Sequence, residues 1–191
     1  MQNFNTTKKL FVISGSSGVG KNTVINRVLE KNPDIAFSIS YTTREKREGE
    51  VEGVNYFYVS RDEFKNSVKE GEFLEWAEFS GNFYGTKRAF VQKCLSKGRD
   101  LILEIDTQGA LQVKEKMPEA VLIFIAPPSY EDLESRLRSR NTETEEAIAK
   151  RLNFVMLEME NSESFDYRVI NDKLEDAIND IEKIIKDERT R

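Results

Sequence analysis

Short apolar runs alternate along the chain with longer segments in which apolar residues recur every three or four positions. The runs predict buried strands at residues 10–14, 100–105 and 120–126, with a less apolar fourth at 167–171. The periodic segments predict helices at 22–31, 90–97, 130–140, 145–160 and 174–186. This alternation predicts an α/β core in which helices flank a parallel sheet.

Two segments depart from this alternation. Residues 37–86 are rich in aromatic and β-branched residues broken by glycines, which predicts a small, mostly antiparallel insert. Residues 137–150 are polar and charged without an apolar stripe, which predicts a mobile lid over the core. The predicted division is an insert at 37–89, a lid at 131–156 and a core formed by residues 1–36, 90–130 and 157–191.

Length and charge limit the classes of protein to consider. The 191 residues suffice for one well-cored domain, and the net charge of −5 argues against a protein that coats nucleic acid or an anionic membrane. The longest apolar runs are too short for a membrane span, so we expect a cytoplasmic protein. With one cysteine, Cys94, and no histidine, an internal disulfide is excluded and structural zinc is not expected.

The stretch GSSGVGKNT at residues 15–23 lies between the first predicted strand and the first predicted helix. Glycines at 15, 18 and 20 followed by Lys21 fit the phosphate-binding loop, in which backbone amides surround phosphate oxygens and the lysine reaches the β- and γ-phosphates. The alternative is an ordinary glycine-rich turn. Position 22 is Asn where the motif has Ser or Thr, so Mg²⁺ binding would fall to the Asn22 amide or the Thr23 hydroxyl.

A second group of basic residues follows in SISYTTREKREGE, residues 38–50. Arg44 and Arg47 stand three residues apart beside several hydroxyl side chains, a pattern that could bind a second phosphate through bidentate bonds. A solvated charge cluster is the alternative interpretation. The residues alone therefore predict a P-loop phosphotransferase with two anion sites.

Six motifs in order make the chain resemble the guanylate kinase family from about residue 9 to residue 185. They are the loop together with TTREKREGEVEGVNYF, FLEWAEFSGNFYGT, LEIDTQG, FIAPPS and RNTETEE. The resemblance implies a P-loop kinase core, an insert that binds GMP and a helical lid. It also implies ATP as co-substrate, Mg²⁺ as cofactor, and GMP, together with dGMP, as phosphoryl acceptor.

The resemblance assigns roles to individual residues. Glu75 and Thr86 would recognise guanine, and Asp106 would lie beside the base and the site of transfer. The phosphate of GMP would be bound by Ser40, Arg44, Arg47, Tyr56 and Tyr84. ATP would be bound by Gly15, Ser16, Ser17, Gly18, Val19, Gly20, Lys21, Asn22, Thr23 and, beside the adenine, Asn171. The residues implied to act on the transferred phosphoryl group are Lys21, Arg44, Arg136, Arg140 and Arg151.

Two other functions are compatible with this resemblance. One is a non-catalytic guanylate-kinase-like module that binds proteins, and the other is a kinase for a different nucleoside monophosphate. The presence of Lys21, Arg44, Arg140 and Arg151 favours an enzyme, and Glu75 favours guanine. Its substrates would be the small molecules ATP and GMP, with the chain acting as a monomer or a homodimer.

Overall fold

The computed structural model describes residues 8–16, 18–138, 152 and 155–191. In the core, strands and helices follow one another in the order β1 (Leu10–Gly15), α1 (Lys21–Lys31), β2 (Ala36–Phe37), α3 (Arg88–Ser96), β7 (Leu101–Glu104), α4 (Thr107–Lys116), β8 (Val121–Ala126), α5 (Tyr130–Arg138), β9 (Tyr167–Ile170) and α7 (Leu174–Arg189). Residues 155–161 are helical and lead into the short 3₁₀ helix η1 (Ser162–Ser164).

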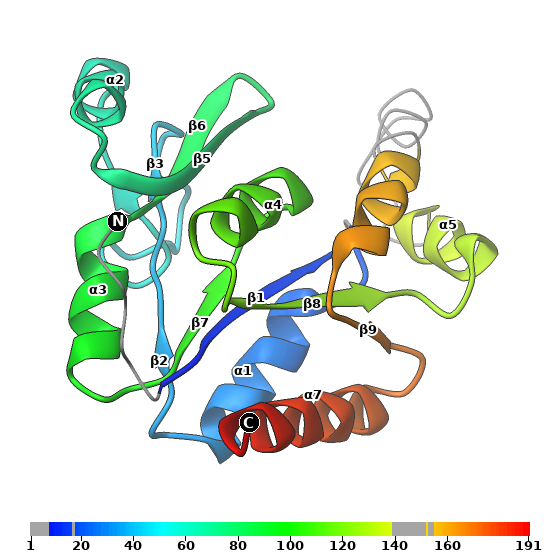
Figure 1. The fold of residues 1–191 in the computed structure, drawn as a ribbon. Helices are drawn as coiled ribbons and strands as arrows, with labels where there is room; N and C mark the ends of the chain where they lie inside the picture. Colours follow the sequence, from blue (N-terminus) through cyan, green and yellow to red (C-terminus); the bar gives the residue numbers. More distant parts are fainter. Residues whose placement is uncertain (1–7, 17, 139–151, 153–154) are drawn as a thin grey trace.

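Within the described residues, the core sheet has five parallel strands in the order β2-β7-β1-β8-β9. Helices cover both of its faces, with α1 and α7 on one side and α3 and α4 on the other (Figure 1). The strand order reverses at β1, whose neighbours β7 and β8 come later in the chain. Ligands of such sheets bind beyond the carboxyl ends of the strands at this point, where β1 ends in Gly15.

Alternation along β1 shows how the sheet separates two apolar layers. Phe11 and Ile13 pack toward α1 and α7, whereas Leu10 and Val12 pack toward α3 and α4. All four side chains are buried, and burial of a side chain of this size stabilises the fold by roughly 1.5–3 kcal/mol. Because both faces are covered, the strands read in the sequence as continuous apolar runs.

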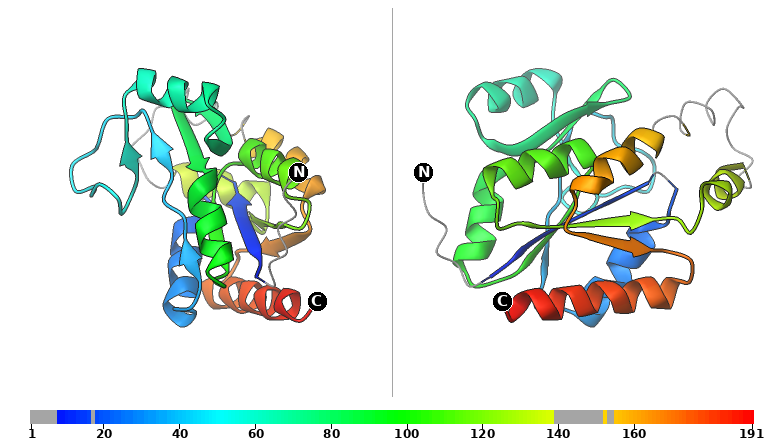
Figure 2. Two further views of the ribbon diagram at one scale, coloured as in Figure 1. Left: turned by 60° about the vertical axis from the view of Figure 1, so that its left-hand side comes forward. Right: turned by 45° about the vertical axis from the view of Figure 1, so that its right-hand side comes forward.

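A second, smaller sheet lies beside the carboxyl ends of the core strands (Figures 1 and 2). Its order is β4-β3-β6-β5, with β3 (Tyr41–Thr42), β4 (Phe57–Tyr58), β5 (Phe73–Phe79) and β6 (Asn82–Lys87). The pairs β3–β6 and β5–β6 are antiparallel and the pair β3–β4 is parallel. Helix α2 (Arg61–Lys69) joins β4 to β5, and its Phe64 stacks on Phe73 and Phe83.

The predicted α/β class and the four predicted core strands are confirmed, with ends that differ by one residue. The structure adds β2, in which Phe37 pairs with Ile102 of the core sheet. Two residues are too few for a periodic signal, which is why the pattern gave no strand there. The apolar face of α7 is formed by Ala177, Ile178, Ile181 and Ile185. None of the described helices combines the length and the apolar composition needed to cross a lipid bilayer.

Candidate active site

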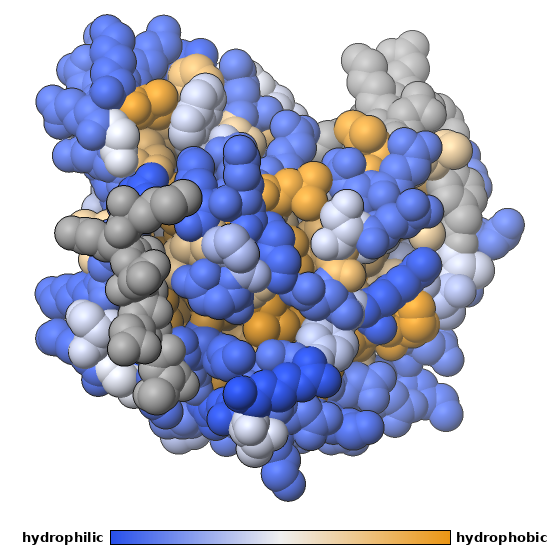
Figure 3. Space-filling model, viewed as in Figure 1, coloured by the Kyte–Doolittle hydropathy of each residue, from blue (hydrophilic) through white to orange (hydrophobic). Residues whose placement is uncertain are grey.

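A cleft of about 710 Å³ lies between the two sheets, beyond the carboxyl ends of β1 and β7. The space-filling view shows that the face seen in Figure 1 is mostly hydrophilic, with apolar side chains exposed in places between the polar ones (Figure 3). The core contributes Gly15, Lys21, Asn22, Asn26, Phe37, Ser38, Glu104, Ile105, Asp106 and Glu158 to the lining. The small sheet and its loops contribute Ser40, Val54, Asn55, Tyr56, Glu75, Ala77, Phe79, Tyr84 and Gly85.

The glycine-rich stretch forms a tight turn between β1 and α1. Gly18 and Gly20 have φ values of 88° and 90°, a conformation that residues with a Cβ atom rarely adopt. The Val19 N–H donates to the Ser16 carbonyl at 3.1 Å, and α1 starts at Lys21 directly after the turn. The amino-terminal end of α1 therefore faces the cleft, and the N–H groups of a first helical turn and its partial positive charge are the arrangement that favours phosphate.

Lys21 lies at the base of the cleft between two acceptors. Its ammonium group donates to the Gly15 carbonyl at 3.4 Å and stands 4.0 Å from the Glu104 carboxylate, which ends β7. Burial raises the pKa of Glu104, and the charge of Lys21 opposes that rise. Glu104 thus orients the lysine toward the space beyond the strands. Its contact with Lys21 was not predicted, because it depends on the pairing of β1 with β7.

Asn171 lies at the end of β9, and its side chain is turned toward the glycine-rich turn. Its amide nitrogen donates to the Val19 carbonyl at 2.7 Å, and a Cβ atom at Gly20 would come within 3.1 Å of the same nitrogen. Asn171 is 7% exposed, so this bond is shielded from water. The structure gives Asn171 a role in holding the turn that the sequence did not suggest, while its contact with adenine stays a prediction.

Glu75 and Thr86 face each other across β5 and β6 and are both buried. Within the described part of the chain, Glu75 Oε1 and Thr86 Oγ1 have no hydrogen-bond partner. Buried polar atoms are rarely left unpaired, so this pair indicates a ligand with complementary donors and acceptors. Burial is the main cause that raises the pKa of Glu75 to about 7; the nearby Thr86 opposes the rise and the charge of Asp106 adds to it.

Arg44 follows β3 and is held by the loop that leads to β4. One guanidinium nitrogen donates to Glu50 Oε1 at 2.7 Å, and the group lies 5.4 Å from the centre of the Tyr56 ring. The hydrogen bond from Arg44 is the main cause that lowers the pKa of Glu50 to about 2. Glu50 also accepts from the Arg47 N–H and the Tyr58 hydroxyl, so one carboxylate organises the basic loop.

The cleft brings together part of the predicted site. Eight of the predicted residues line it, namely Gly15, Lys21, Asn22, Ser40, Tyr56, Glu75, Tyr84 and Asp106. Thr86 lies opposite Glu75 on the neighbouring strand β6, whereas Arg44 and Arg47 are in the adjoining loop, with the side chain of Arg47 exposed. Ser17, Arg140 and Arg151 lie outside the described residues. Arg136 is in α5, and the placement of its side chain is likewise outside what the structure describes.

Ser38 is a site residue that the sequence did not single out. It lines the cleft two positions before Ser40, and its hydroxyl is buried without a hydrogen-bond partner among the described residues. The alternation of serines in SIS placed both hydroxyls on one side of an extended segment. That period of two was the signal that could have found it.

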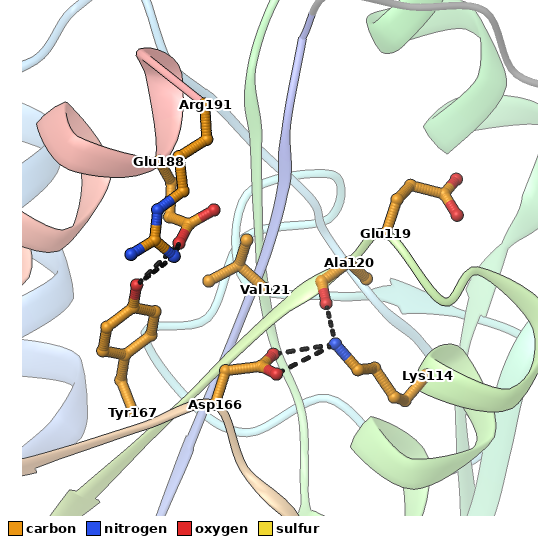
Figure 4. A pocket seen from close by; sticks show the side chains of 8 residues that line it. All are labelled: Lys114, Glu119, Ala120, Val121, Asp166, Tyr167, Glu188 and Arg191. Atoms are coloured by element: carbon orange, nitrogen blue, oxygen red, sulfur yellow. Dashed lines mark hydrogen bonds and ion pairs between the residues drawn. The ribbon is translucent and has the colours of Figure 1, made fainter.

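A second hollow, of about 490 Å³, lies at the opposite ends of the strands, where β8 and β9 begin (Figure 4). Four of the five charged side chains that line it are paired with each other, Lys114 with Asp166 at 2.9 Å and Arg191 with Glu188 at 2.7 Å, and the fifth is Glu119. Tyr167 donates to Glu188 at 2.6 Å. Among the residues drawn, both basic side chains are already paired and Glu119 adds only negative charge, so this hollow does not suit a phosphate group, and the cleft beyond β1 is the candidate active site.

A parallel sheet with a glycine-rich turn at the carboxyl end of its first strand defines the class of P-loop nucleotide-binding proteins. The family model described as guanylate kinase matches residues 7–188 of this chain. The chain belongs to the guanylate kinase family.

Individual relatives agree with this assignment over nearly the whole chain. The guanylate kinase of one strain of Prochlorococcus marinus is 50% identical over 186 residues, which are 97% of this chain and 100% of that protein. The guanylate kinase of Caldanaerobacter subterraneus is 50% identical over 95% of this chain and 88% of its own length. The crystal structure of guanylate kinase from Anaplasma phagocytophilum superposes with a TM-score of 0.80 at 35% identity, covering 97% of this chain and 88% of that one.

Proposed function

We propose that this protein transfers the terminal phosphoryl group of ATP to GMP, and also to dGMP, in the cleft between the two sheets. The observation that carries the proposal is the buried pair Glu75 and Thr86, whose Oε1 and Oγ1 atoms lack partners in the described structure. The cleft that Glu75 lines has the phosphate-binding lysine on its other wall. In the same proposal the protein is cytoplasmic, where both soluble nucleotides would reach it.

The chemistry of guanine complements this pair of side chains. A carboxylate at Glu75 would accept hydrogen bonds from guanine N1–H and from the 2-amino group, and the Thr86 hydroxyl would donate to O6. Adenine carries neither of these donors, so binding it would leave the buried Glu75 unpaired. An unpaired buried group of this kind costs about 1–3 kcal/mol or more, which favours guanine over adenine.

The two phosphate groups would be bound from opposite walls of the cleft. The amides of the glycine-rich turn and Lys21 would hold the phosphates of ATP, as the open amino-terminal end of α1 favours. On the other wall, Ser40, Tyr56 and Tyr84 line the cleft, and Arg44 stacks near Tyr56 in the adjoining loop. Arg136, Arg140 and Arg151 would add positive charge near the transferred group.

The reaction would proceed by in-line attack of a GMP phosphate oxygen on the γ-phosphorus of ATP. A phosphate monoester has a second pKa near 6, so the attacking oxygen is already anionic at neutral pH and needs no general base. The chain, which contains no histidine, would therefore contribute position and charge. Lys21 and the turn amides would stabilise the charge that develops on the transferred phosphoryl group.

When bound together with ATP, Mg²⁺ would supply positive charge that offsets part of the charge of the phosphates. The described residues contain no cluster of three acidic, histidine or cysteine side chains that could hold a metal ion alone. Asn22, in the first turn of α1, lines the cleft and offers one amide oxygen, while Thr23 offers a hydroxyl. These donors fit an ion held mostly by phosphates and water.

Asn22→Ser is expected to lower the Mg²⁺ concentration for half-maximal activity by about threefold, because the hydroxyl is the donor that this loop position normally supplies. The measurement is a Mg²⁺ titration of ADP formation at fixed total ATP. Asn26→Ser is the matched control, since Asn26 lines the same cleft one turn further along α1. An unchanged midpoint in Asn22→Ser would mean that position 22 does not ligate the ion.

The proposed function is tested by a coupled assay of ADP formation with ATP and each of GMP, dGMP, AMP, CMP and UMP. We expect turnover with GMP and dGMP and at most a trace with the other three. Equal turnover with AMP would contradict the guanine assignment. An absence of ADP with every acceptor would favour the non-catalytic binding module instead.

A further inference from the structure

Helix α4 holds the free edge of the strand that carries Glu75. Strand β5 is at the end of the small sheet, so alternate backbone groups along it have no neighbouring strand in the described part of the chain. Gln112 of α4 pairs with Trp76 of β5 in both directions: its Oε1 accepts from the Trp76 N–H at 3.3 Å, and its Nε2 donates to the Trp76 carbonyl at 2.8 Å. The side-chain amide thus takes the place of a peptide unit from a further strand.

The residue on the other side of Glu75 is held by the same helix. Lys116, four positions after Gln112, donates from its ammonium group to the Leu74 carbonyl at 2.6 Å. Residues 112 and 116 lie one above the other on a helix, so they meet two positions of β5 that are separated by one residue, Trp76 and Leu74. Glu75 therefore stands between two backbone positions, 74 and 76, that are both anchored to α4.

The helix also defines the space that the carboxylate occupies. Gly109, in the first turn of α4, approaches Glu75 so closely that a Cβ atom there would lie 2.7 Å from Glu75 Oε2 and 3.3 Å from its Cδ. The Gly109 N–H donates to Asp106 Oδ1 at 2.7 Å, which fixes the first turn to the capping residue. Asp106 lines the same cleft as Glu75.

We propose that α4 is the positioning element for Glu75, with Gln112 anchoring β5 and Gly109 fixing where the carboxylate lies. Gln112 is a positioning residue in this scheme, because its contacts are with the backbone of Trp76. Because α4 belongs to the core, it fixes the position of β5, and with it Glu75, relative to the core as well as to the small sheet. The proposal rests on the proposed function, in which Glu75 recognises guanine.

The test uses Trp76 itself, the only tryptophan of the chain, as a fluorescent reporter of nucleotide binding. GMP and IMP are compared because IMP lacks the 2-amino group, so a displaced carboxylate weakens GMP more than IMP. Gln112→Leu keeps the side-chain bulk and removes both hydrogen bonds to Trp76. Glu115→Ala is the matched control, on an exposed position of the same helix.

For Gln112→Leu we expect about tenfold weaker GMP binding, equivalent to about 1.4 kcal/mol. The preference for GMP over IMP should fall by about fivefold, with the KM for ATP unchanged. Gly109→Ala should weaken GMP at least as much, since its methyl group displaces the carboxylate. Glu115→Ala should match the wild type in all three quantities.

Equal losses for GMP and IMP in Gln112→Leu, accompanied by a lower melting temperature, would show that α4 only stabilises the fold. A GMP preference in Gly109→Ala equal to that of the wild type, with an unchanged melting temperature, would also overturn the proposal. Failure of the proposed function has a different signature, because the wild-type protein would then show no preference for GMP over IMP.

Discussion

Lys21→Ala is expected to lower kcat for phosphoryl transfer by about 10²–10³-fold, the effect of removing one group that stabilises transition-state charge. The reason lies in the position of Lys21 between the Gly15 carbonyl and the Glu104 carboxylate at the carboxyl end of the strands. Without the ammonium group, Glu104 would face the ATP phosphates with no compensating charge. The measurement is single-turnover phosphoryl transfer at saturating ATP and GMP.

Lys31→Ala is the control for this prediction, because Lys31 ends the same helix and pairs with Glu182 far from the cleft. It should retain wild-type turnover. Circular dichroism and the melting temperature establish that both variants fold. If Lys21→Ala kept its kcat within about fivefold of the wild type, the glycine-rich turn would not be the catalytic phosphate site.

Glu75→Gln is expected to remove most of the preference for GMP over AMP, a loss of about 10-fold to 100-fold in the ratio of kcat/KM values. Glutamine has the size of glutamate, but its amide group can accept only one of the two guanine donors and places an N–H against the other. The effect should fall on acceptor choice, with the KM for ATP unchanged. Coupled assays with GMP and AMP measure the ratio directly, and an unaltered ratio would exclude Glu75 as the base reader.

The same carboxylate gives GMP binding a pH dependence. Glu75 must be ionised to accept two hydrogen bonds, and its pKa in the free protein is raised to about 7. The KM for GMP should therefore fall as pH rises from 6 to 8 in the wild-type protein, beyond the change caused by the phosphate of GMP. Glu75→Gln measures the change that the phosphate of GMP causes by itself, because this variant lacks the carboxylate. Parallel pH profiles in the two proteins would contradict this account.

The free energy of unfolding of the free protein should decrease as pH rises, whereas GMP binding becomes tighter. The folded protein retains a proton on Glu75 up to about pH 7, whereas the unfolded chain loses it near the ordinary value of 4.5. Protonation at this site therefore stabilises the fold, and the contribution declines by about 3 kcal/mol in all as pH rises through that window. Melting temperatures of the wild type and Glu75→Gln, compared from pH 5 to 8, measure this difference.

Most of the core fold could be predicted from the sequence, because each buried strand lies between two helical layers. Such strands are apolar throughout, so residues 10–14 and 120–126 stood out directly. β2 did not, since its two residues pair with β7 only after the chain has folded. The ends of helices were less certain, and α3 begins at Arg88, two residues before the predicted start.

The candidate site could be predicted from sequence in its local parts. The glycine-rich stretch carries its own signal, because the turn, Lys21 and the start of α1 are contiguous. Contacts that join distant segments left no such signal. The pairing of Lys21 with Glu104, the bond from Asn171 to Val19 and the anchoring of Trp76 by Gln112 all depend on the tertiary arrangement.

The most direct test of the account is a crystal structure of the protein with GMP and a non-hydrolysable ATP analogue bound. We expect the guanine edge against Glu75 and Thr86, the GMP phosphate beside Arg44, and the ATP phosphates on the turn that precedes Lys21. The two phosphate chains should then meet end to end in the cleft. A guanine base bound elsewhere, or a Lys21 side chain directed away from the phosphates, would contradict the account.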